Sequence, residues 1–246
     1  MRIAVISDIH GNLAALEAVL AAVAGRCDQV WCLGDVVGYG ARPNECIDVV
    51  RDRCRVVLAG NHDLAACGAE DASRFSHDAG RAIRWTREVL RPDCERWLAG
   101  LTPALDRGQV GLYHGSPRDP VWEYVLDATT AEAALRAVEK PLVLCGHTHG
   151  AIAALLDGPR LSGGRATHGR EVTLGEARRA LLNPGSVGQP RDGDPRASYL
   201  LLECRDDGLP TRARFLREPY DVGRTQREIA LAGLPQHLAD RLSFGM

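Results

Sequence analysis

The sequence has no long hydrophobic run. No stretch reaches the roughly 18 consecutive apolar residues that span a bilayer. The first apolar run is followed at once by polar Ser7, Asp8 and His10, which is unlike the hydrophobic region of a signal peptide. We therefore expect no membrane segment and a cytoplasmic location.

Paired cysteines at metal-binding spacing are also missing. The eight cysteines include no Cys-x-x-Cys pair, and several, among them Cys32 and Cys145, lie inside apolar runs. This pattern is typical of reduced cysteines in a core. It argues against both a disulfide framework and a zinc ribbon.

Positive charge is not in excess, and lysine is nearly absent. Lys140 is the only lysine, and the 246 residues carry a formal net charge of -2. A protein that binds nucleic acid mainly by neutralising phosphates is usually basic, so the sequence gives no strong nucleic-acid signal. The 45% hydrophobic and 25% charged residues are typical of a globular protein, of one large domain or two small ones. Nothing in the sequence indicates an oligomeric state.

The first 150 residues alternate between strand and helix patterns. Short, β-branched apolar runs predict strands at residues 2–7, 29–33, 55–59, 109–113 and 142–145. Helical spacing of apolar residues predicts helices at residues 12–25, 45–53, 76–100 with a break at Pro92, and 130–138. The alternation predicts strand-helix-strand units around a mostly parallel sheet.

The alternation of strand and helix patterns stops after Gly150. Strand patterns at residues 151–156, 180–182, 199–203 and 212–216 have no helix between them, which predicts a second sheet that is antiparallel or mixed. Residues 157–175 are polar and glycine-rich, and we expect a mobile hairpin tip or surface loop there. Residues 223–242 predict two helices separated at Gly233 to Pro235.

Polar side chains gather just after the predicted strands of the first 150 residues. The blocks are Asp8-Ile-His10, Gly34-Asp35, Gly60-Asn-His-Asp63, His114-Gly115 and Gly146-His-Thr-His149. Open α/β sheets place their ligand sites beyond the carboxyl ends of strands, so we expect these loops to meet at one edge. Asp, Asn and His without a Cys ligand suit divalent metals such as Mn²⁺, Fe²⁺ or Zn²⁺. Outside the blocks, we expect His77 to have a partner near a helix start, and His168 and His237 to be solvated.

In this order, the five blocks resemble the signature blocks of the calcineurin-like metallophosphoesterase superfamily. The blocks Val37-Gly-Tyr-Gly40, His114-Gly-Ser-Pro117 and Asn183 to Asp192 further resemble a branch of small bacterial and archaeal phosphoesterases. The resemblance covers almost the whole chain. It implies a single metallophosphoesterase domain over residues 1–246, with a helical tail from about residue 220. The implied α/β fold is a four-layer αββα sandwich, with two mixed sheets packed face to face and flanked by helices.

The resemblance also implies two divalent metal ions and a set of site residues. We expect Mn²⁺, with Fe²⁺, Zn²⁺ and Ni²⁺ as alternatives. By resemblance, Asp8, His10, Asp35 and His149 would hold one ion, and Asp35, Asn61, His114 and His147 the other, so that Asp35 would bridge. The implied reaction is in-line attack on phosphorus by hydroxide that the metal pair activates, with His62 as the general acid. Tyr39, Arg118 and Arg191 are the candidate substrate-binding residues.

One block departs from the protein serine/threonine phosphatases. Gly38-Tyr39-Gly40 stands where that branch has Asp-Arg-Gly, whose arginine binds the substrate phosphate. The departure argues against a protein phosphatase. We expect hydrolysis of phosphodiesters or phosphomonoesters of nucleotides or similar small molecules. The alternative is a non-catalytic metal-binding scaffold or interaction protein on the same fold, and the presence of His62 and of the ligand positions favours the enzyme.

Overall fold

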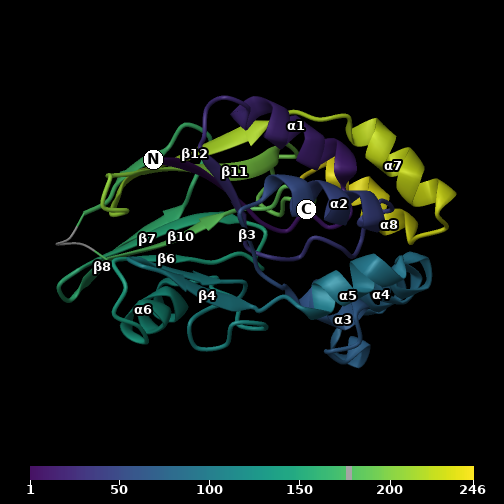
Figure 1. The fold of residues 1–246 in the computed structure, drawn as a ribbon, viewed down its shortest axis with the longest axis horizontal. Helices are drawn as coiled ribbons and strands as arrows, with labels where there is room; N and C mark the ends of the chain where they lie inside the picture. Colours follow the sequence, from purple (N-terminus) through teal and green to yellow (C-terminus); the bar gives the residue numbers. More distant parts are fainter. Residues whose placement is uncertain (176–178) are drawn as a thin grey trace.

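The computed structural model describes residues 1–175 and 179–246, in which two six-stranded sheets pack face to face between helices (Figure 1). The strands are β1 (Arg2–Ile6), β2 (Gln29–Cys32), β3 (Val56–Val57), β4 (Ala104–Arg107), β5 (Val110–Tyr113), β6 (Leu142–Leu144), β7 (Ala151–Asp157), β8 (Arg160–Arg165), β9 (Glu171–Thr173), β10 (Arg179–Pro184), β11 (Ala197–Cys204) and β12 (Pro210–Glu218). The helices are α1 (Leu13–Val23), α2 (Pro43–Arg53), α3 (Asn61–Ala66), α4 (His77–Val89), α5 (Pro92–Ala99), α6 (Ala128–Arg136), α7 (Val222–Leu231) and α8 (Gln236–Asp240), with short 3₁₀ turns at Ala72–Arg74 and Arg241–Ser243.

Both sheets are mixed, as the resemblance implies. In the first sheet the order is β3-β2-β1-β11-β12-β9, and β1, β2 and β3 run parallel while β11 pairs antiparallel with β1. In the second sheet the order is β4-β5-β6-β10-β7-β8, with β5, β6 and β10 parallel. The predicted fold class is therefore confirmed.

The alternation of side chains along β1 shows how the layers form. Ile3 and Val5 face the second sheet and pack with residues such as Leu144, whereas Ala4 and Ile6 face the helices on the outside. Successive side chains of a strand point to opposite faces, so a strand between two layers must be apolar throughout. The same arrangement in the second sheet places α6 on its outer face.

Helix α1 begins where the sequence predicts. The Asn12 side chain accepts a hydrogen bond from the Ala15 backbone N–H at 3.2 Å, which caps the helix. Thr225 on α7 donates to the same Asn12 oxygen at 2.8 Å. The tail helices α7 and α8 are separated at Gly233 to Pro235, as predicted, and α7 lies beside α1 (Figure 1).

The expected division of the sheets at Gly150 is wrong. Strands β4 to β6 precede Gly150 but belong to the second sheet, and β9, β11 and β12 follow it but belong to the first. Strands that are buried on both faces have continuous apolar runs. Such runs carry no information about which sheet a strand joins.

The expectation of a loop over residues 157–175 is also wrong in part, because the segment contains β8 and β9. A Cβ atom on Gly163 of β8 would collide with the Ala153 carbonyl of β7, so this glycine permits close strand approach rather than marking a loop. Strand β4 and helix α3 were not predicted either, since β4 is short and largely exposed and α3 begins inside a polar block.

None of the helices in the described residues is both long enough and apolar enough to cross a membrane.

Candidate active site

The five polar blocks meet at one end of the sandwich. Strands β1, β2 and β3 of the first sheet and β5 and β6 of the second each end just before one block. The structure brings together all the residues predicted as metal ligands, which are Asp8, His10, Asp35, Asn61, His114, His147 and His149. The loops meet across the ends of two sheets, rather than at the edge of one sheet as expected.

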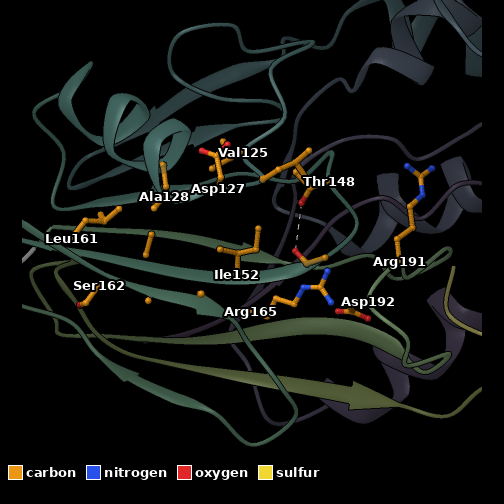
Figure 2. Close-up of a pocket in the computed structure, with 16 residues that line it drawn as sticks. Val125, Asp127, Ala128, Thr148, Ile152, Leu161, Ser162, Arg165, Arg191 and Asp192 are labelled. Atoms are coloured by element: carbon orange, nitrogen blue, oxygen red, sulfur yellow. Dashed lines mark hydrogen bonds between the residues drawn. The ribbon is translucent and has the colours of Figure 1, made fainter.

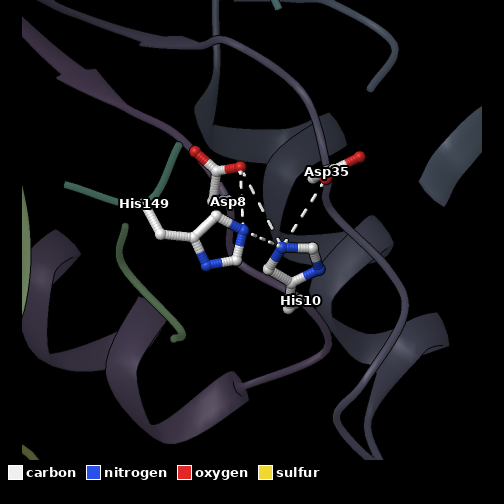
Figure 3. Close-up of side chains that lie close together, drawn as sticks. All are labelled: Asp8, His10, Asp35 and His149. Atoms are coloured by element: carbon white, nitrogen blue, oxygen red, sulfur yellow. Dashed lines mark hydrogen bonds and ion pairs between the residues drawn. The ribbon is translucent and has the colours of Figure 1, made fainter. Parts of the chain in front are cut away.

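The first cluster contains Asp8, His10, Asp35 and His149, all fully buried (Figure 3). The Nε2 atoms of His10 and His149 lie 3.0 Å apart. His149 Nε2 is 3.4 Å from Asp8 Oδ1, and His10 Nε2 is 3.6 Å from Asp35 Oδ2. Four possible ligand atoms therefore converge from three different loops.

The second cluster shares Asp35 with the first. His114 Nε2 lies 3.5 Å from Asp35 Oδ2, 3.2 Å from His147 Nδ1 and 3.1 Å from Asn61 Oδ1. The same carboxylate oxygen thus faces a histidine of each cluster. Asp35 occupies the position between the clusters that a bridging ligand requires.

The orientation of the histidine rings fits metal ions. The Nδ1–H groups of His10, His114 and His149 donate to the backbone carbonyls of Val37, Leu33 and Gln189, at 3.1, 2.9 and 2.7 Å. In a neutral ring this leaves a lone pair on Nε2. The close Nε2 atoms of His10 and His149 are then two acceptors facing each other, which repel unless a cation lies among them.

Ionisation in the clusters agrees with this fit. Burial lowers the pKa of His10 and His149 well below the usual range, and that of His147 to about 2. Burial raises the pKa of Asp8 to about 7 and the pKa of Asp35 well above its usual value. Neutral imidazole is the form that binds metal, and a neighbouring cation offsets the cost of ionising a buried carboxylate. Both clusters suit divalent metal ions.

Backbone strain is concentrated at the same place. In the described part of the chain, the non-glycine residues with positive φ have values from 50° to 65°, and all are predicted site residues: Asp8, His10, Asp35, Tyr39, His147 and His149. This conformation costs on the order of 1 to 3 kcal/mol for each residue. Strain that collects at one group of side chains indicates a functional site.

Two glycines make room for the site. A Cβ atom on Gly60 would collide with Asp35 Oδ1, and one on Gly38 would collide with His62 Nδ1. The Asp63 carboxylate accepts hydrogen bonds from the backbone N–H groups of Val37 and Gly60, each at 3.0 Å. Asp63 therefore joins the two loops that carry these glycines, a role that its place in the block does not reveal.

His62 lies beside the clusters rather than in them. Its backbone N–H donates to Asp35 Oδ1 at 2.9 Å, and its ring centroid is 4.4 Å from that of Tyr39 and 4.8 Å from that of Phe75. Its Nδ1 atom is buried without a hydrogen-bond partner among the described residues. Burial lowers the pKa of His62, so the ring is neutral and keeps one N–H.

The candidate substrate-binding residues differ in position. Arg191 donates from Nη2 to the Tyr39 hydroxyl at 3.3 Å and to Gln189 Oε1 at 2.9 Å, and its buried Nε has no partner in the described chain. Arg118 instead pairs with Glu123 at 3.3 Å, and its side chain is 46% exposed. The structure places Tyr39 and Arg191 at the site, whereas the charge of Arg118 is neutralised by Glu123.

The remaining histidines lie away from the clusters. His77 starts α4 and pairs with Asp78 at 3.2 Å, as predicted, and its side chain is exposed. His237 is exposed as well. His168 is exposed, but its Nδ1 accepts a hydrogen bond from the Arg217 backbone N–H at 3.0 Å, so it is not merely solvated.

Sequence reasoning missed several residues that support or border the site. Asn183 donates from Nδ2 to the Gly146 carbonyl at 2.6 Å and to Thr148 Oγ1 at 2.9 Å, which holds the loop that carries His147 and His149. The Tyr124 ring stacks on His147 with centroids 3.9 Å apart. Asn183 lies in a block that resembles the family, but no local pattern marks Tyr124.

The sandwich fold and the two clusters at its strand ends define a metallophosphoesterase. The chain belongs to the calcineurin-like phosphoesterase superfamily, because the model of that superfamily domain matches residues 1–207. This confirms the family that the sequence blocks resemble.

Two similar proteins match nearly the whole chain, and a third matches part of it. The structure resembles that of a metallophosphoesterase from Sphaerobacter thermophilus, with 40% identity, a TM-score of 0.89, and coverage of 100% of this chain and 99% of that one. An uncharacterized protein of Methanocaldococcus jannaschii is 35% identical over 249 residues, which cover 99% of this chain and 98% of that protein. A symmetrical bis(5'-nucleosyl)-tetraphosphatase of Psychromonas ingrahamii is 30% identical over 102 residues, or 39% of this chain and 36% of that protein.

Proposed function

We propose that the protein is a metal-dependent hydrolase of phosphodiesters or phosphomonoesters of nucleotides or similar small molecules. The observation that carries the proposal is the pair of clusters that share Asp35 Oδ2, which lies 3.6 Å from His10 Nε2 and 3.5 Å from His114 Nε2. One carboxylate oxygen between two sets of lone pairs is the arrangement that a pair of metal ions needs.

The residues would divide between two divalent ions. Asp8, His10, Asp35 and His149 form one ligand set, and Asp35, Asn61, His114 and His147 form the other. Because the ligands are nitrogen and oxygen atoms without a thiolate, Mn²⁺ is the first metal to test, before Fe²⁺, Zn²⁺ and Ni²⁺. When bound, such ions supply positive charge to phosphate oxygens and activate water.

Two further side chains would act on the substrate. His62 would hold a ring N–H toward the leaving oxygen, since its neutral imidazole is buried beside the first cluster, with its ring centroid 4.8 Å from that of His10. Arg191 would bind a phosphate oxygen through its unpartnered Nε. The Tyr39 hydroxyl, which accepts from Arg191 Nη2, would keep that guanidinium over the site.

The partial relative supports a nucleotide-type substrate. The name of the Psychromonas ingrahamii protein is that of an enzyme that acts on bis(5'-nucleosyl) tetraphosphates. The scaffold alternative has less support, because His62 is buried at the clusters together with every predicted metal ligand, and a scaffold needs no proton donor there.

We expect the diester to be a substrate. Tyr39 stands where the protein phosphatases have an arginine, so Arg191, which contacts the Tyr39 hydroxyl, would have to supply the guanidinium charge there. A diester carries one negative charge rather than two and depends less on that charge. The test compares kcat/KM for 4-nitrophenyl phosphate and bis(4-nitrophenyl) phosphate on metal-stripped protein with Mn²⁺ restored. Mn²⁺-dependent hydrolysis of the diester is expected. Hydrolysis of the monoester alone would show a phosphomonoesterase instead.

A further inference from the structure

A cleft of about 410 Å³ lies between helix α6 and the β7–β8 hairpin (Figure 2). Its walls are mainly apolar, with Val125 and Ala131 on one side and Ile152, Ala154 and Leu161 on the other. Ser162, Gly163 and Gly164 form a stretch of β8 with little side chain, so this part of the wall is mostly backbone. The volume and lining are those of a small-molecule site.

The cleft borders the candidate active site. Thr148, which lines it, lies between the two predicted ligands His147 and His149. Arg191 lines it as well, and the same guanidinium contacts Tyr39. Val125 follows Tyr124, whose ring stacks on His147. A molecule held at the clusters can therefore extend into the cleft.

The charges at the mouth of the cleft favour an anionic ligand. Arg165 and Arg191 both line the cleft, and the hydrogen-bond partners of the Arg191 side chain in the described chain are the uncharged Tyr39 and Gln189. The nearby Asp192 carboxylate pairs with the buried Arg217. Asp127 also lines the cleft, but its carboxylate accepts from the backbone N–H of Thr130 at 2.8 Å and caps α6.

The position of His62 decides which part of an ester enters. His62 packs against Tyr39 and Phe75, and none of these three residues lines the cleft. A proton donor at His62 would place the leaving oxygen outside the cleft. The cleft would then receive the substituent that stays on phosphorus.

We propose that the cleft binds a planar aromatic group on the retained substituent of a phosphodiester, whose phosphate lies at the two clusters. This inference rests on the proposed function and narrows it to diesters with such a group. Apolar walls, a stretch of backbone without large side chains and two arginines at the mouth suit an aromatic group attached to a phosphate.

The test uses two diesters with the same leaving group. After 4-nitrophenolate leaves, bis(4-nitrophenyl) phosphate retains an aryl group on phosphorus, and methyl 4-nitrophenyl phosphate retains a methyl group. Each kcat/KM is divided by the uncatalysed rate of its ester, because the two esters differ in intrinsic reactivity. Wild-type protein with Mn²⁺ should favour the aryl ester by about tenfold or more, because burial of an aryl group gains far more than burial of a methyl group.

Two variants fill the cleft away from the clusters. Ala128→Trp, at the exposed start of α6, should lower the preference for the aryl ester at least fivefold, mainly by raising the KM of that ester. If this variant does not fold, Leu161→Trp on β8 replaces it. Ala137→Trp is the matched control, because Ala137 is exposed at the other end of α6 and does not line the cleft.

The outcomes separate the two proposals. Metal-dependent hydrolysis of both esters without an aryl preference, or a preference that the folded filling variant retains, would overturn the cleft assignment and leave the proposed function intact. If wild-type protein with Mn²⁺ hydrolyses 4-nitrophenyl phosphate but neither diester, the cleft assignment is overturned and a phosphomonoesterase remains. If it hydrolyses none of the three esters, the proposed function itself is wrong.

Discussion

At the scale of single residues, the two oxygens of Asp35 have different surroundings. Oδ1 accepts a hydrogen bond from the His62 backbone N–H at 2.9 Å. Oδ2 has no hydrogen-bond donor among the described residues and faces His10 and His114. One carboxylate therefore positions the proposed proton donor and joins the two clusters.

Asp35→Asn should lower kcat/KM by on the order of 10³ or more and reduce bound metal. A neutral amide cannot offset the charge of two ions, and no neighbouring side chain can replace the carboxylate. The measurements are metal content and turnover of bis(4-nitrophenyl) phosphate. Asp106→Asn, an exposed position on β4, is the matched control. An Asp35→Asn protein with normal metal content and turnover would contradict the assignment of the clusters.

His62→Ala should keep the fold and the bound metal but slow turnover by on the order of 10² to 10⁴. The defect should shrink for leaving groups of low pKa, such as 4-nitrophenolate, which depart without a proton. The measurement is kcat for a series of leaving groups, with His77→Ala as the exposed control. A defect of equal size across the series would assign His62 to charge stabilisation instead.

The metal-ligand candidates could be identified from the sequence because their residue types are unusual at strand ends, and the order of the blocks resembles a family. The supporting residues could not. Asp63 and Asn183 act through backbone groups that only the folded loops bring within reach. No feature of the sequence distinguished Arg118 from Arg191 as a phosphate-binding residue. The ion pair between Arg118 and Glu123 is visible only in the structure.

At the scale of elements, the loop from Gly146 to Gly150 depends on strand β10. Asn183, near the end of β10, donates to the Gly146 carbonyl and to Thr148 Oγ1, and its own Oδ1 accepts from the Gly185 N–H at 2.8 Å. Its amide is fully buried. These bonds fix the loop on which His147 and His149 adopt positive φ.

Asn183→Ala should therefore weaken metal binding by about 10- to 100-fold. Turnover at saturating Mn²⁺ should recover most of the wild-type value, because the ligands themselves remain. The measurement is activity as a function of Mn²⁺ concentration. Asn44→Ala is the control, since Asn44 also bonds backbone groups, those of Val89 and Arg91, but lies on α2. An unchanged Mn²⁺ dependence in Asn183→Ala would contradict the positioning role.

Helices in which apolar residues recur with a clear period were predicted correctly from the sequence. Strands that can be recognised only by their pairing with another strand were not. Helices α4 and α5, with their break at Pro92, follow the pattern of apolar residues. Strand β8 is mostly exposed and contains two glycines, so only its pairing with β7 identifies it as a strand. The partition of strands between the sheets depends on long-range contacts that no local pattern encodes.

At the scale of the whole molecule, the site lies where the two sheets meet. Asp8, Asp35 and Asn61 follow strands of the first sheet, whereas His114, His147 and His149 follow strands of the second. Ions bound to both sets would link the sheets. They would also offset the strain and the buried charge that the folded chain holds there.

Removal of metal should therefore destabilise the entire fold. At a free metal concentration 100-fold above Kd, each ion contributes about 2.7 kcal/mol to the free energy of unfolding. For a chain of this size, the loss corresponds to a fall in Tm of roughly 5 to 10 °C per ion. Thermal melts with and without a chelator give the value, with the Asp35→Asn protein as the control whose Tm should respond less. An identical Tm in both conditions would show that the clusters hold no metal.

The central claim is that metal held by these clusters hydrolyses phosphoesters. The most direct test adds Mn²⁺ stepwise to stripped protein and measures, in the same samples, metal bound per chain and turnover of bis(4-nitrophenyl) phosphate. The account predicts no turnover in the stripped protein and a rise to a plateau as two ions bind to each chain. A folded protein that binds no divalent metal, or that hydrolyses the ester equally well without it, would contradict the account.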